Sequence, residues 1–262
     1  MTIISSKDNE MVKNIRKLKD KKYRDEFNEY IIEGTKLINE AFNEKAKMKT
    51  IVVCEDCVTR GQMDTKLLYE IAKYNCIYVT ESVFNSLTDV VNHQGMLAVV
   101  EKKSVTQNVD YSADLIVILD DIQDPGNLGT ILRTMDSTGL TQIILSKGSA
   151  DSYSQKVVRS TMGAIFRVNI IESDNLQDEI KLLKKNKFKI LTTSLNTDNS
   201  VFDFNFSKSV LIIGNEGRGV SEEIQKLSDN KIKIPMLGKT ESLNASVATG
   251  IILYEYVRQK LK

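Results

Sequence analysis

The feature that most constrains the fold is a regular alternation, from Ala113 onward, of short apolar runs and amphipathic segments. The apolar runs have the length and the β-branched composition of buried strands, and the segments between them place apolar side chains at helical spacing. Strands separated by helices predict an α/β fold with a parallel sheet that is covered on both faces. The expected strands are 115–119, 142–146, 166–171, 188–194, 210–214 and 231–235, and the expected helices are 127–137, 152–162, 176–185, 221–227 and one from about 244.

The first half of the chain has a different rhythm, because helical and strand signals are mixed there. Residues 102–112 are polar and lack apolar periodicity, which is typical of a linker between domains. We therefore expect a smaller α/β domain over residues 1–103, a linker over 104–112 and a second domain over 113–262.

The charge of the chain is balanced overall but not along its length. Thirty-six Lys and Arg against 35 Asp and Glu give a net charge of +1, which neither indicates nor excludes nucleic acid. Residues 1–24, in contrast, hold eight basic and three acidic side chains, a net of +5, around an expected helix at 11–22. This density predicts either a phosphate-contacting surface or a solvated helix face. The basic residues expected to contact phosphates are Lys13, Arg16, Lys17, Lys21, Lys22 and Arg24.

Several classes of protein are disfavoured by composition. Three cysteines do not make a disulfide framework, and no run approaches the ~20 apolar residues of a membrane helix, so we expect a cytoplasmic protein without a membrane span. A single histidine leaves little room for His-dependent catalysis. Cys54, Cys57, Cys76 and His93 could be written as a zinc set, but their spacing matches no common zinc finger, and we expect no metal.

The first segment that carries chemistry is D-P-G-N-L-G-T-I-L-R, residues 124–133, directly after an expected strand. The Asp-Pro-Gly turn precedes Asn127, which is well suited to cap the following helix. Arg133 points away from the apolar face, so it can reach a phosphate, a carboxylate or a neighbouring subunit, or it can be a plain surface arginine. The apolar face of this helix is expected to consist of Leu128, Ile131, Leu132 and Met135.

The second segment is L-I-I-G-N-E-G-R-G, residues 211–219, again a strand followed by a glycine loop. Its glycines read G-x-x-G-x-G, which is neither the Rossmann fingerprint nor a P-loop. The loop can approach a ligand closely, and Glu216 suits a cationic partner, a ribose hydroxyl or an arginine. The alternative is a tight turn with a solvated glutamate.

The third segment is I-P-M-L-G, residues 234–238, followed by S-L-N-A-S-V-A-T-G-I, residues 242–251. Pro235 ends a strand, and Ser242 or Asn244 can cap the last helix. The apolar stripe of that helix predicts a core face, a dimer interface or both, and consists of Leu243, Val247, Gly250, Ile251, Tyr254 and Val257.

Together, in this order and spacing, the three segments resemble the motifs of the SpoU/TrmH family of RNA ribose 2′-O-methyltransferases. The resemblance covers the second domain. It extends weakly into the first, where K-x-x-x-x-L-x-x-K-K-x-R and Ile32-Glu33-Gly34 are similar to the family's RNA substrate-binding domain. The resemblance implies a SPOUT fold with a deep C-terminal trefoil knot, a homodimer, and S-adenosyl-L-methionine bound in the knot in a bent conformation.

The resemblance also assigns roles to residues. It implies a catalytic and substrate-positioning set of Asn127, Arg133, Glu216, Ser242 and Asn244. A guanidinium is a poor general base, so our hypothesis is that Arg133 stabilises the developing alkoxide or clamps a phosphate, with Glu216 and Asn127 fixing its fork. The resemblance implies that Arg133 and the pocket it serves come from different subunits. The implied cofactor pocket is lined by Thr193, Ser194, Gly214, Ile234, Met236 and Leu243.

The expected activity is therefore methylation of a ribose 2′-hydroxyl in structured RNA that depends on S-adenosyl-L-methionine. Ribosomal RNA is the expected substrate, with transfer RNA as the alternative. Two other classes compete with this prediction. One is a catalytically silent RNA-binding protein, and the other is a SPOUT enzyme that methylates a base and presents an Asp or another base near the target nitrogen.

Overall fold

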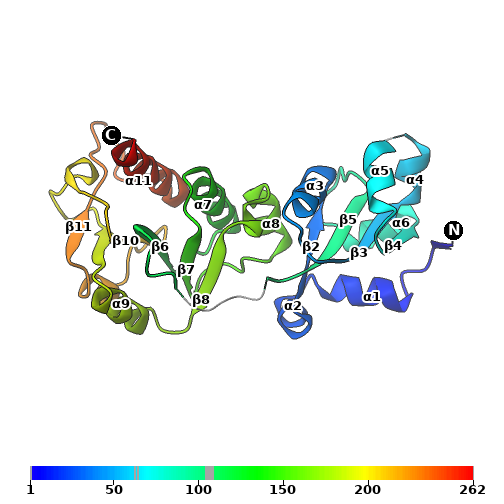
Figure 1. The fold of residues 1–262 in the computed structure, drawn as a ribbon, viewed down its shortest axis with the longest axis horizontal. Helices are drawn as coiled ribbons and strands as arrows, with labels where there is room; N and C mark the ends of the chain where they lie inside the picture. The colour runs from blue at the N-terminus through cyan, green and yellow to red at the C-terminus, as the bar shows by residue number, and fades with distance from the viewer. Residues whose placement is uncertain (1, 62, 64, 104–108, 262) are drawn as a thin grey trace. The chain divides into compact units, whose positions relative to one another are not determined.

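The structure, a computed structural model, describes residues 2–61, 63, 65–103 and 109–261. Its chain forms two compact units, drawn in Figure 1. The first consists of Met1–Ser104 and Tyr153–Phe166, and the second of Val105–Ser152 and Arg167–Lys262. Part of the linker predicted from the sequence, residues 104–108, lies outside the described residues.

The second unit contains a six-stranded sheet in the order β11-β9-β10-β6-β7-β8, in which every pair of neighbours is parallel. This confirms the α/β fold with a parallel sheet. The strands are β6 (Leu115–Asp120), β7 (Gln142–Ser146), β8 (Asn169–Ser173), β9 (Lys189–Thr193), β10 (Ser209–Gly214) and β11 (Asn230–Ile232).

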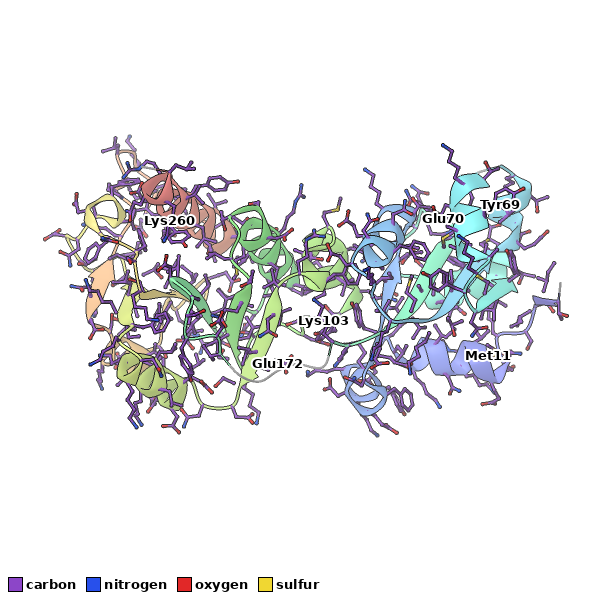
Figure 2. The ribbon with its side chains drawn as sticks, in the orientation of Figure 1. Met11, Tyr69, Glu70, Lys103, Glu172 and Lys260 are labelled. Atoms are coloured by element: carbon purple, nitrogen blue, oxygen red, sulfur yellow. The ribbon has the colours of Figure 1, made fainter. Side chains whose placement is uncertain are left out.

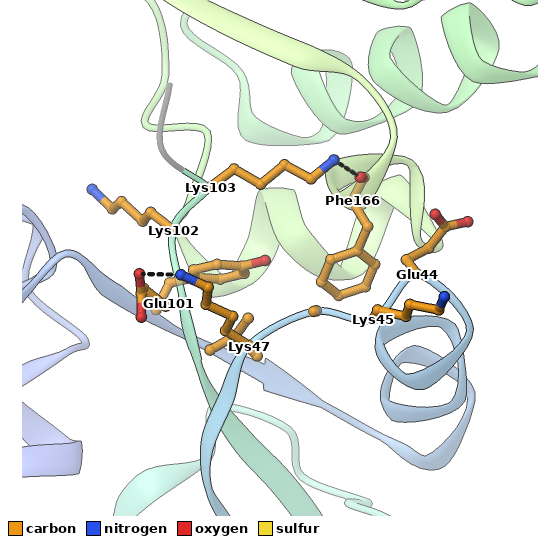
Figure 3. A pocket seen from close by; sticks show the side chains of 10 residues that line it. Glu44, Lys45, Lys47, Glu101, Lys102, Lys103 and Phe166 are labelled. Carbon is orange, nitrogen blue, oxygen red and sulfur yellow. Dashed lines mark hydrogen bonds and ion pairs between the residues drawn. The ribbon is translucent and has the colours of Figure 1, made fainter. Parts of the chain in front are cut away.

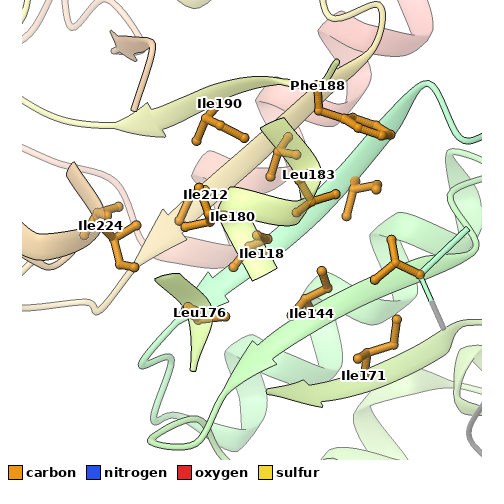
Figure 4. Packing of buried hydrophobic residues seen from close by; sticks show 14 residues of the cluster. Ile118, Ile144, Ile171, Leu176, Ile180, Leu183, Phe188, Ile190, Ile212 and Ile224 are labelled. Atoms are coloured by element: carbon orange, nitrogen blue, oxygen red, sulfur yellow. The ribbon is translucent and has the colours of Figure 1, made fainter. Parts of the chain in front are cut away.

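Helices cover both faces of this sheet, with α7 (Pro125–Ser137) and α11 (Ala245–Lys260) packed together on one face (Figure 1). The other face holds α9 (Leu176–Lys185) and the short α10 (Glu222–Gln225). Residues Val201–Asp203 form a 3-10 turn, η2. Strand side chains alternate between the faces, so every second residue points toward α9. Figure 4 shows this core, in which α9 packs on Ile118, Ile144, Ile171, Ile190 and Ile212.

Local differences from the predicted elements have local causes. Asp124, not Asn127, is the N-cap of α7, because its Oδ1 accepts the Asn127 N–H over 2.8 Å and Pro125 occupies the first turn. The strand expected at 166–171 starts only at Asn169, because the chain first forms a 3-10 turn, η1 (Ala164–Phe166). The predicted apolar face of α7 is confirmed, with no exposed surface on Leu128, Ile131, Leu132 and Met135.

The first unit contains a five-stranded mixed sheet in the order β1-β4-β3-β5-β2. Its strands are β1 (Ile3–Ile4), β2 (Glu29–Glu33), β3 (Met48–Cys54), β4 (Cys76–Val79) and β5 (Met96–Glu101). Strands β1, β4 and β3 run parallel, whereas β5 is antiparallel to β3 and β2. The accompanying helices are α1 (Glu10–Lys17), α2 (Lys21–Phe27), α3 (Thr35–Asn43), α4 (Glu55–Thr59), α5 (Thr65–Ile71) and α6 (Glu81–Leu87).

Helix α8 (Gln155–Thr161) also belongs to the first unit, although the sequence places it in the second domain. It packs against β2, where the Tyr153 ring lies 4.9 Å from that of Tyr30. Gln155 Nε2 donates to the Leu87 carbonyl over 3.4 Å. Periodicity predicts a helix here but not the sheet on which the helix packs.

The single helix expected at 11–22 is two helices, α1 and α2. Helix α1 stops at Leu18, and Asp20 caps α2 by accepting the Lys22 N–H over 2.9 Å. The buried guanidinium of Arg24 donates to the Leu18 carbonyl over 2.7 Å and so satisfies an end of α1. None of the helices in the described part of the chain is long and apolar enough to cross a bilayer.

Candidate active site

The three sequence motifs meet at the carboxyl edge of the parallel sheet. Strands β6 and β10 are neighbours whose register pairs Asp120 with Gly214, so the loops after the two strands start side by side. The third motif leads into α11, which reaches the same place because it packs against α7. Ligands of parallel α/β sheets bind at this edge.

A chain of side-chain hydrogen bonds joins the motifs through Asn127. Its Nδ2 donates to Glu216 Oε1 over 2.8 Å, and its Oδ1 accepts from Asn244 Nδ2 over 2.9 Å. The partners lie 89 and 117 residues away along the chain. Asn127 is only 8% exposed, whereas Glu216 and Asn244 are exposed. One buried amide therefore fixes two residues that solvent or a ligand can reach.

The helix cap at Asn244 determines the donor-to-acceptor direction of this series of hydrogen bonds. Asn244 Oδ1 accepts the N–H groups of Ser246 and Val247 over 2.9 and 3.3 Å as the N-cap of α11. Its amide N–H₂ must then face Asn127 Oδ1, and Asn127 in turn must present its N–H₂ to Glu216. The chain ends on a carboxylate, which only accepts. Each amide has one orientation that satisfies all of its neighbours.

Two residues that the sequence analysis did not single out hold the loop of Glu216. Asn215 Oδ1 accepts the N–H groups of Gly217 and Arg218 over 2.9 and 3.1 Å, and its Nδ2 donates to the Asp121 carbonyl over 2.9 Å. The Asp121 carboxylate also pairs with the Arg218 guanidinium. Asp121 lies in the left-handed region at φ 65°, directly after a strand. In the sequence, Asp121 could have been identified from the pair of polar residues that follows the buried strand.

Gly214 ends β10 at a point where the backbone folds back on itself. A Cβ at this position would lie 2.0 Å from Val220 N and 2.1 Å from the carbonyl carbon of Gly219. Asn215 and Gly219 form an antiparallel bridge, and Gly219 has φ 70°. The loop of Glu216 is therefore a tight backbone loop closed against the end of its own strand.

Thr193, Ser194, Gly214 and Ile234 lie at or just after the ends of adjacent strands, since the sheet order begins β11-β9-β10. Met236 and Leu243 follow in the segment that leads to α11. Thr193 Oγ1 donates to the Ile212 carbonyl over 3.3 Å, and Ser194 N–H donates to the Ile232 carbonyl over 3.0 Å. Residues 234–243 have no hydrogen bond to any described residue, so their backbone groups are open. The remaining members of the set lie there or at the end of β10: Gly214, Ile234, Met236 and Leu243.

Two members of the expected catalytic set do not join the network in this chain. Arg133 is exposed and forms no hydrogen bond or ion pair with the described residues. It follows Asn127 by six residues, which is about 240° of helical rotation, so the two side chains leave α7 in different directions. The hypothesis that Asn127 and Glu216 fix the fork of Arg133 is therefore not supported within one chain. Ser242 is exposed and likewise has no partner among the described residues.

None of the residues in the apolar stripe of α11 is buried in the core, since each is exposed or half-buried. Val247 is 51% and Tyr254 55% exposed, and the buried apolar residues of the helix are Ile252 and Leu253. Tyr254 Oη lies 3.3 Å from Ser137 Oγ at the end of α7. The stripe therefore adjoins α7, the helix that carries Arg133.

The basic residues of the first unit separate into different environments. Arg24 is buried and bonded to Leu18, so it is a structural residue and the prediction that it contacts RNA is corrected. Lys13 pairs with Asp8, and Lys21 pairs with Asp25. Three side chains have no carboxylate partner in the described part of the chain, namely Arg16, Lys17 and Lys22.

A cavity of about 200 Å³ in the first unit has a different lining (Figure 3). Lys47 pairs with Glu101 over 3.3 Å at its rim, and Lys103 donates to the Phe166 carbonyl. No residue of the three motifs lines this cavity. It is therefore separate from the site that the motifs build.

The cysteines are packed within the first unit. Cys54 and Cys57 are buried, and burial together with the neighbouring Cys54 raises the pKa of the Cys57 thiol to about 12. A thiol that keeps its proton at neutral pH is a poor nucleophile and a poor metal ligand. No three His, Cys, Asp or Glu side chains lie close enough to hold a metal ion anywhere in the described residues.

Comparison with known proteins connects these features to a family. Residues 114–254 match the SpoU rRNA Methylase family, and residues 9–98 match the MRM3-like substrate binding domain. The chain is 33% identical over 258 residues to the 23S rRNA (guanosine(2553)-2'-O)-methyltransferase RlmP of Bacillus subtilis (strain 168), an alignment that covers 97% of this chain and 98% of the relative.

Solved structures with a similar fold carry the cofactor named in their descriptions. The AdoMet-bound rRNA methyltransferase from Sinorhizobium meliloti is 31% identical with a TM-score of 0.85, covering 100% of this chain and 98% of that one. The SpoU methyltransferase AviRb from Streptomyces viridochromogenes, in complex with AdoMet, is 27% identical with a TM-score of 0.84, covering 97% and 99%.

Proposed function

We propose a reaction for this chain on the basis of its family, since the chain belongs to the SpoU rRNA Methylase family. The protein transfers a methyl group from S-adenosyl-L-methionine to a ribose 2′-hydroxyl of structured RNA, and ribosomal RNA is the substrate. The observation that carries this proposal is the Glu216–Asn127–Asn244 chain, which joins the three motif loops at one edge of the sheet.

The open backbone of residues 234–243 fits the cofactor. A nucleoside base presents several donors and acceptors, and these ten residues have no hydrogen bond to the described residues. Half-buried Met236 and Leu243 supply apolar surface beside them. When bound, the cofactor supplies a methyl group on a sulfonium sulfur. Gly214 lets the loop of Glu216 close without a side chain in the way.

In this proposal Glu216 orients the ribose. Its Oε1 is occupied by Asn127, whereas its Oε2 accepts no hydrogen bond from the described residues. The free oxygen is available to accept a ribose hydroxyl, and the buried Asn127 amide keeps it in place. Methyl transfer is an in-line displacement, so holding the acceptor hydroxyl in a fixed position supplies much of the rate. Ser242 contacts the same ribose in this proposal, since it is exposed and has no partner among the described residues.

Arg133 acts in the site of a second copy in this proposal. Its side chain is exposed, and the exposed apolar stripe of α11 adjoins its helix, so a second chain seated on the stripe lies next to Arg133. A guanidinium there stabilises the developing alkoxide or clamps an adjacent phosphate. The protein is then a homodimer. The segment between β11 and α11 passes through the neighbouring loops to form the deep trefoil knot, as the family resemblance implies.

The first unit recognises the RNA, since residues 9–98 match a substrate-binding domain. Its exposed Lys17 and Lys22 and the half-buried Arg16 have no carboxylate partner among the described residues and are available to phosphates, with Lys13 and Lys21 as further contacts. The three cysteines are unpaired, which suits the reducing cytoplasm.

Calorimetric titration with S-adenosyl-L-methionine tests cofactor binding, and an absence of binding would leave only a silent RNA-binding protein. Alkaline hydrolysis of the methylated RNA tests whether the ribose is the methyl acceptor. A 2′-O-methyl group protects its linkage from alkali, so an alkali-stable dinucleotide is expected. An alkali-labile product with a methylated base would instead indicate a base methyltransferase. Mapping in a deletion strain decides between ribosomal and transfer RNA.

Co-expression of two impaired variants tests the shared site. Arg133→Lys in one chain and Glu216→Gln in the other leave one intact site in each mixed dimer only if the two residues come from different chains. Random pairing then restores about a quarter of the wild-type sites. If both residues served the site of their own chain, every site would keep one defect and activity would stay at the level of the single variants.

A further inference from the structure

We infer that Tyr23 and Phe27 of α2 form a platform on which an unpaired base of the substrate RNA stacks, with Lys17 and Lys22 placed for the adjoining phosphates. This inference deepens the proposed function and rests on it, because it names the class of RNA structure that the first unit reads. The expected target is a loop, a bulge or a strand end, where bases are unstacked.

The geometry of the two rings comes from their spacing on the helix. Residues i and i+4 lie on the same face, and the ring centroids are 5.9 Å apart with an interplanar angle of 28°. Phe27 is 38% exposed and Tyr23 is half-buried, so the pair is not part of the core. Helix α2 ends directly after Phe27, at Asn28 in the left-handed conformation. The platform therefore lies at the C-terminal end of α2.

The charges around Tyr23 distinguish this pair from an ordinary surface contact. Lys17 Nζ lies 5.8 Å and Lys22 Nζ 5.4 Å from the centre of its ring, one from each of two successive helices. Neither ammonium has a carboxylate partner among the described residues, in contrast to the neighbouring Lys19 and Lys21. Two cations without a carboxylate partner among the described residues lie at the half-buried Tyr23 ring, next to the exposed Phe27 ring. Such a group matches a nucleotide, which offers both an anion and a π face.

A second aromatic pair in the same unit shows what a purely structural contact looks like. Tyr30 and Tyr153 have ring centroids 4.9 Å apart, and Tyr30 is only 2% exposed. Tyr23 and Phe27 keep exposed ring surface instead. A protein partner could cover the apolar rings, but it would also have to supply anions for the two lysines. RNA supplies both from one repeating unit.

Two single-stranded probes separate stacking from charge. The full chain is titrated with an oligouridylate of about 12 nucleotides, within the range of site sizes of single-strand binders, and with an abasic strand of the same length and charge. Tyr23→Leu and Phe27→Leu are each expected to weaken oligouridylate binding about 10-fold, about 1.4 kcal/mol, and to leave abasic binding unchanged. Lys22→Gln is expected to weaken both and to reduce the salt dependence.

Tyr69 offers a matched control, because it is 80% exposed on α5 of the same unit (Figure 2). Tyr69→Leu removes an exposed ring without changing charge, and it is expected to leave both affinities unchanged. The chain has no tryptophan, so Tyr23→Trp introduces a single indole. Its fluorescence is expected to be quenched by the oligouridylate in a saturable way and not by the abasic strand.

Equal binding of the two probes, or oligouridylate affinities of Tyr23→Leu and Phe27→Leu equal to that of wild type, would overturn the platform. Circular dichroism of each variant establishes that a loss of affinity is not a loss of fold. Titration with S-adenosyl-L-methionine and analysis of methylated nucleosides test the proposed function separately. Intact methylation with unchanged oligouridylate binding in the variants defeats only the platform, whereas lost binding in a chain that never methylates ribose defeats only the activity.

Discussion

Replacing Gly214 with alanine tests the idea that the loop of Glu216 depends on a side chain being absent. The added Cβ would lie 2.0 Å from Val220 N, whereas an ordinary contact needs 3.4 Å. The backbone must therefore give way by the difference, 3.4 − 2.0, which is about 1.4 Å. Both nearest atoms are backbone atoms, so no side chain can rotate out of the way.

A shift of that size is enough to break the site. The Glu216 Oε1 to Asn127 Nδ2 distance is 2.8 Å, and an added displacement of about 1.4 Å along it exceeds hydrogen-bonding range. Misplacement by about 1 Å can cost a factor of 100 in rate. Overpacking costs about 1–3 kcal/mol of stability, or about 3 °C in the unfolding midpoint for each kcal/mol in a unit of this size.

Gly217→Ala is the matched control in the same loop, because its Cβ would meet only Asn215 Oδ1, at 3.7 Å. We expect Gly214→Ala to lose at least about 10-fold in calorimetric affinity for S-adenosyl-L-methionine and about 100-fold in methylation of RNA. Gly217→Ala should keep both. Wild-type affinity and rate in Gly214→Ala, or equal losses in the two variants, would refute the reasoning.

Three further predictions concern other parts of the chain. Arg133→Lys should lower kcat/KM for RNA by about 10-fold or more without changing cofactor affinity, because an ammonium cannot form the bidentate contact, and near-full methylation would contradict this. Arg24→Met should cost about 1.5–3 kcal/mol in urea unfolding, since it leaves the Leu18 carbonyl without its charged donor; the exposed Lys22→Met is the control. Burial raises the pKa of the Glu33 carboxyl. Between the pKa of the unfolded state and that of the folded state, the folded chain holds a proton that the unfolded chain has released, so stability falls as pH rises through this range. Glu33→Gln should flatten this fall in unfolding midpoints measured from about pH 4 to 8, and an unchanged slope would exclude the effect.

The sequence alone determined much of the second unit. The alternation of strands and helices predicted a parallel sheet, and the spacing of Leu128, Ile131, Leu132 and Met135 predicted the buried face of α7. These features are local, because the period of a helix or strand fixes which side chains share a face. The motif loops were found for the same reason, since each follows directly on an apolar run.

Local periodicity failed where a single polar side chain decided the outcome. The cap at Asp20 divided one predicted helix into two, and the cap at Asp124 moved the start of α7 ahead of Asn127. Arg24 counts as a surface cation by composition, yet it is buried against Leu18. Charge patterns do not show whether a cation is needed to satisfy a helix end.

Only the tertiary structure decided which distant residues meet. Asn127 reaches Glu216 and Asn244 across 89 and 117 residues because the sheet places β10 beside β6 and α11 beside α7. The same structure separates Arg133 from Asn127, only six residues away, because the helix turns its side chain elsewhere. Sequence spacing determines which side chains share a face of a helix or strand. The order of strands in the sheet determines which distant side chains that face meets.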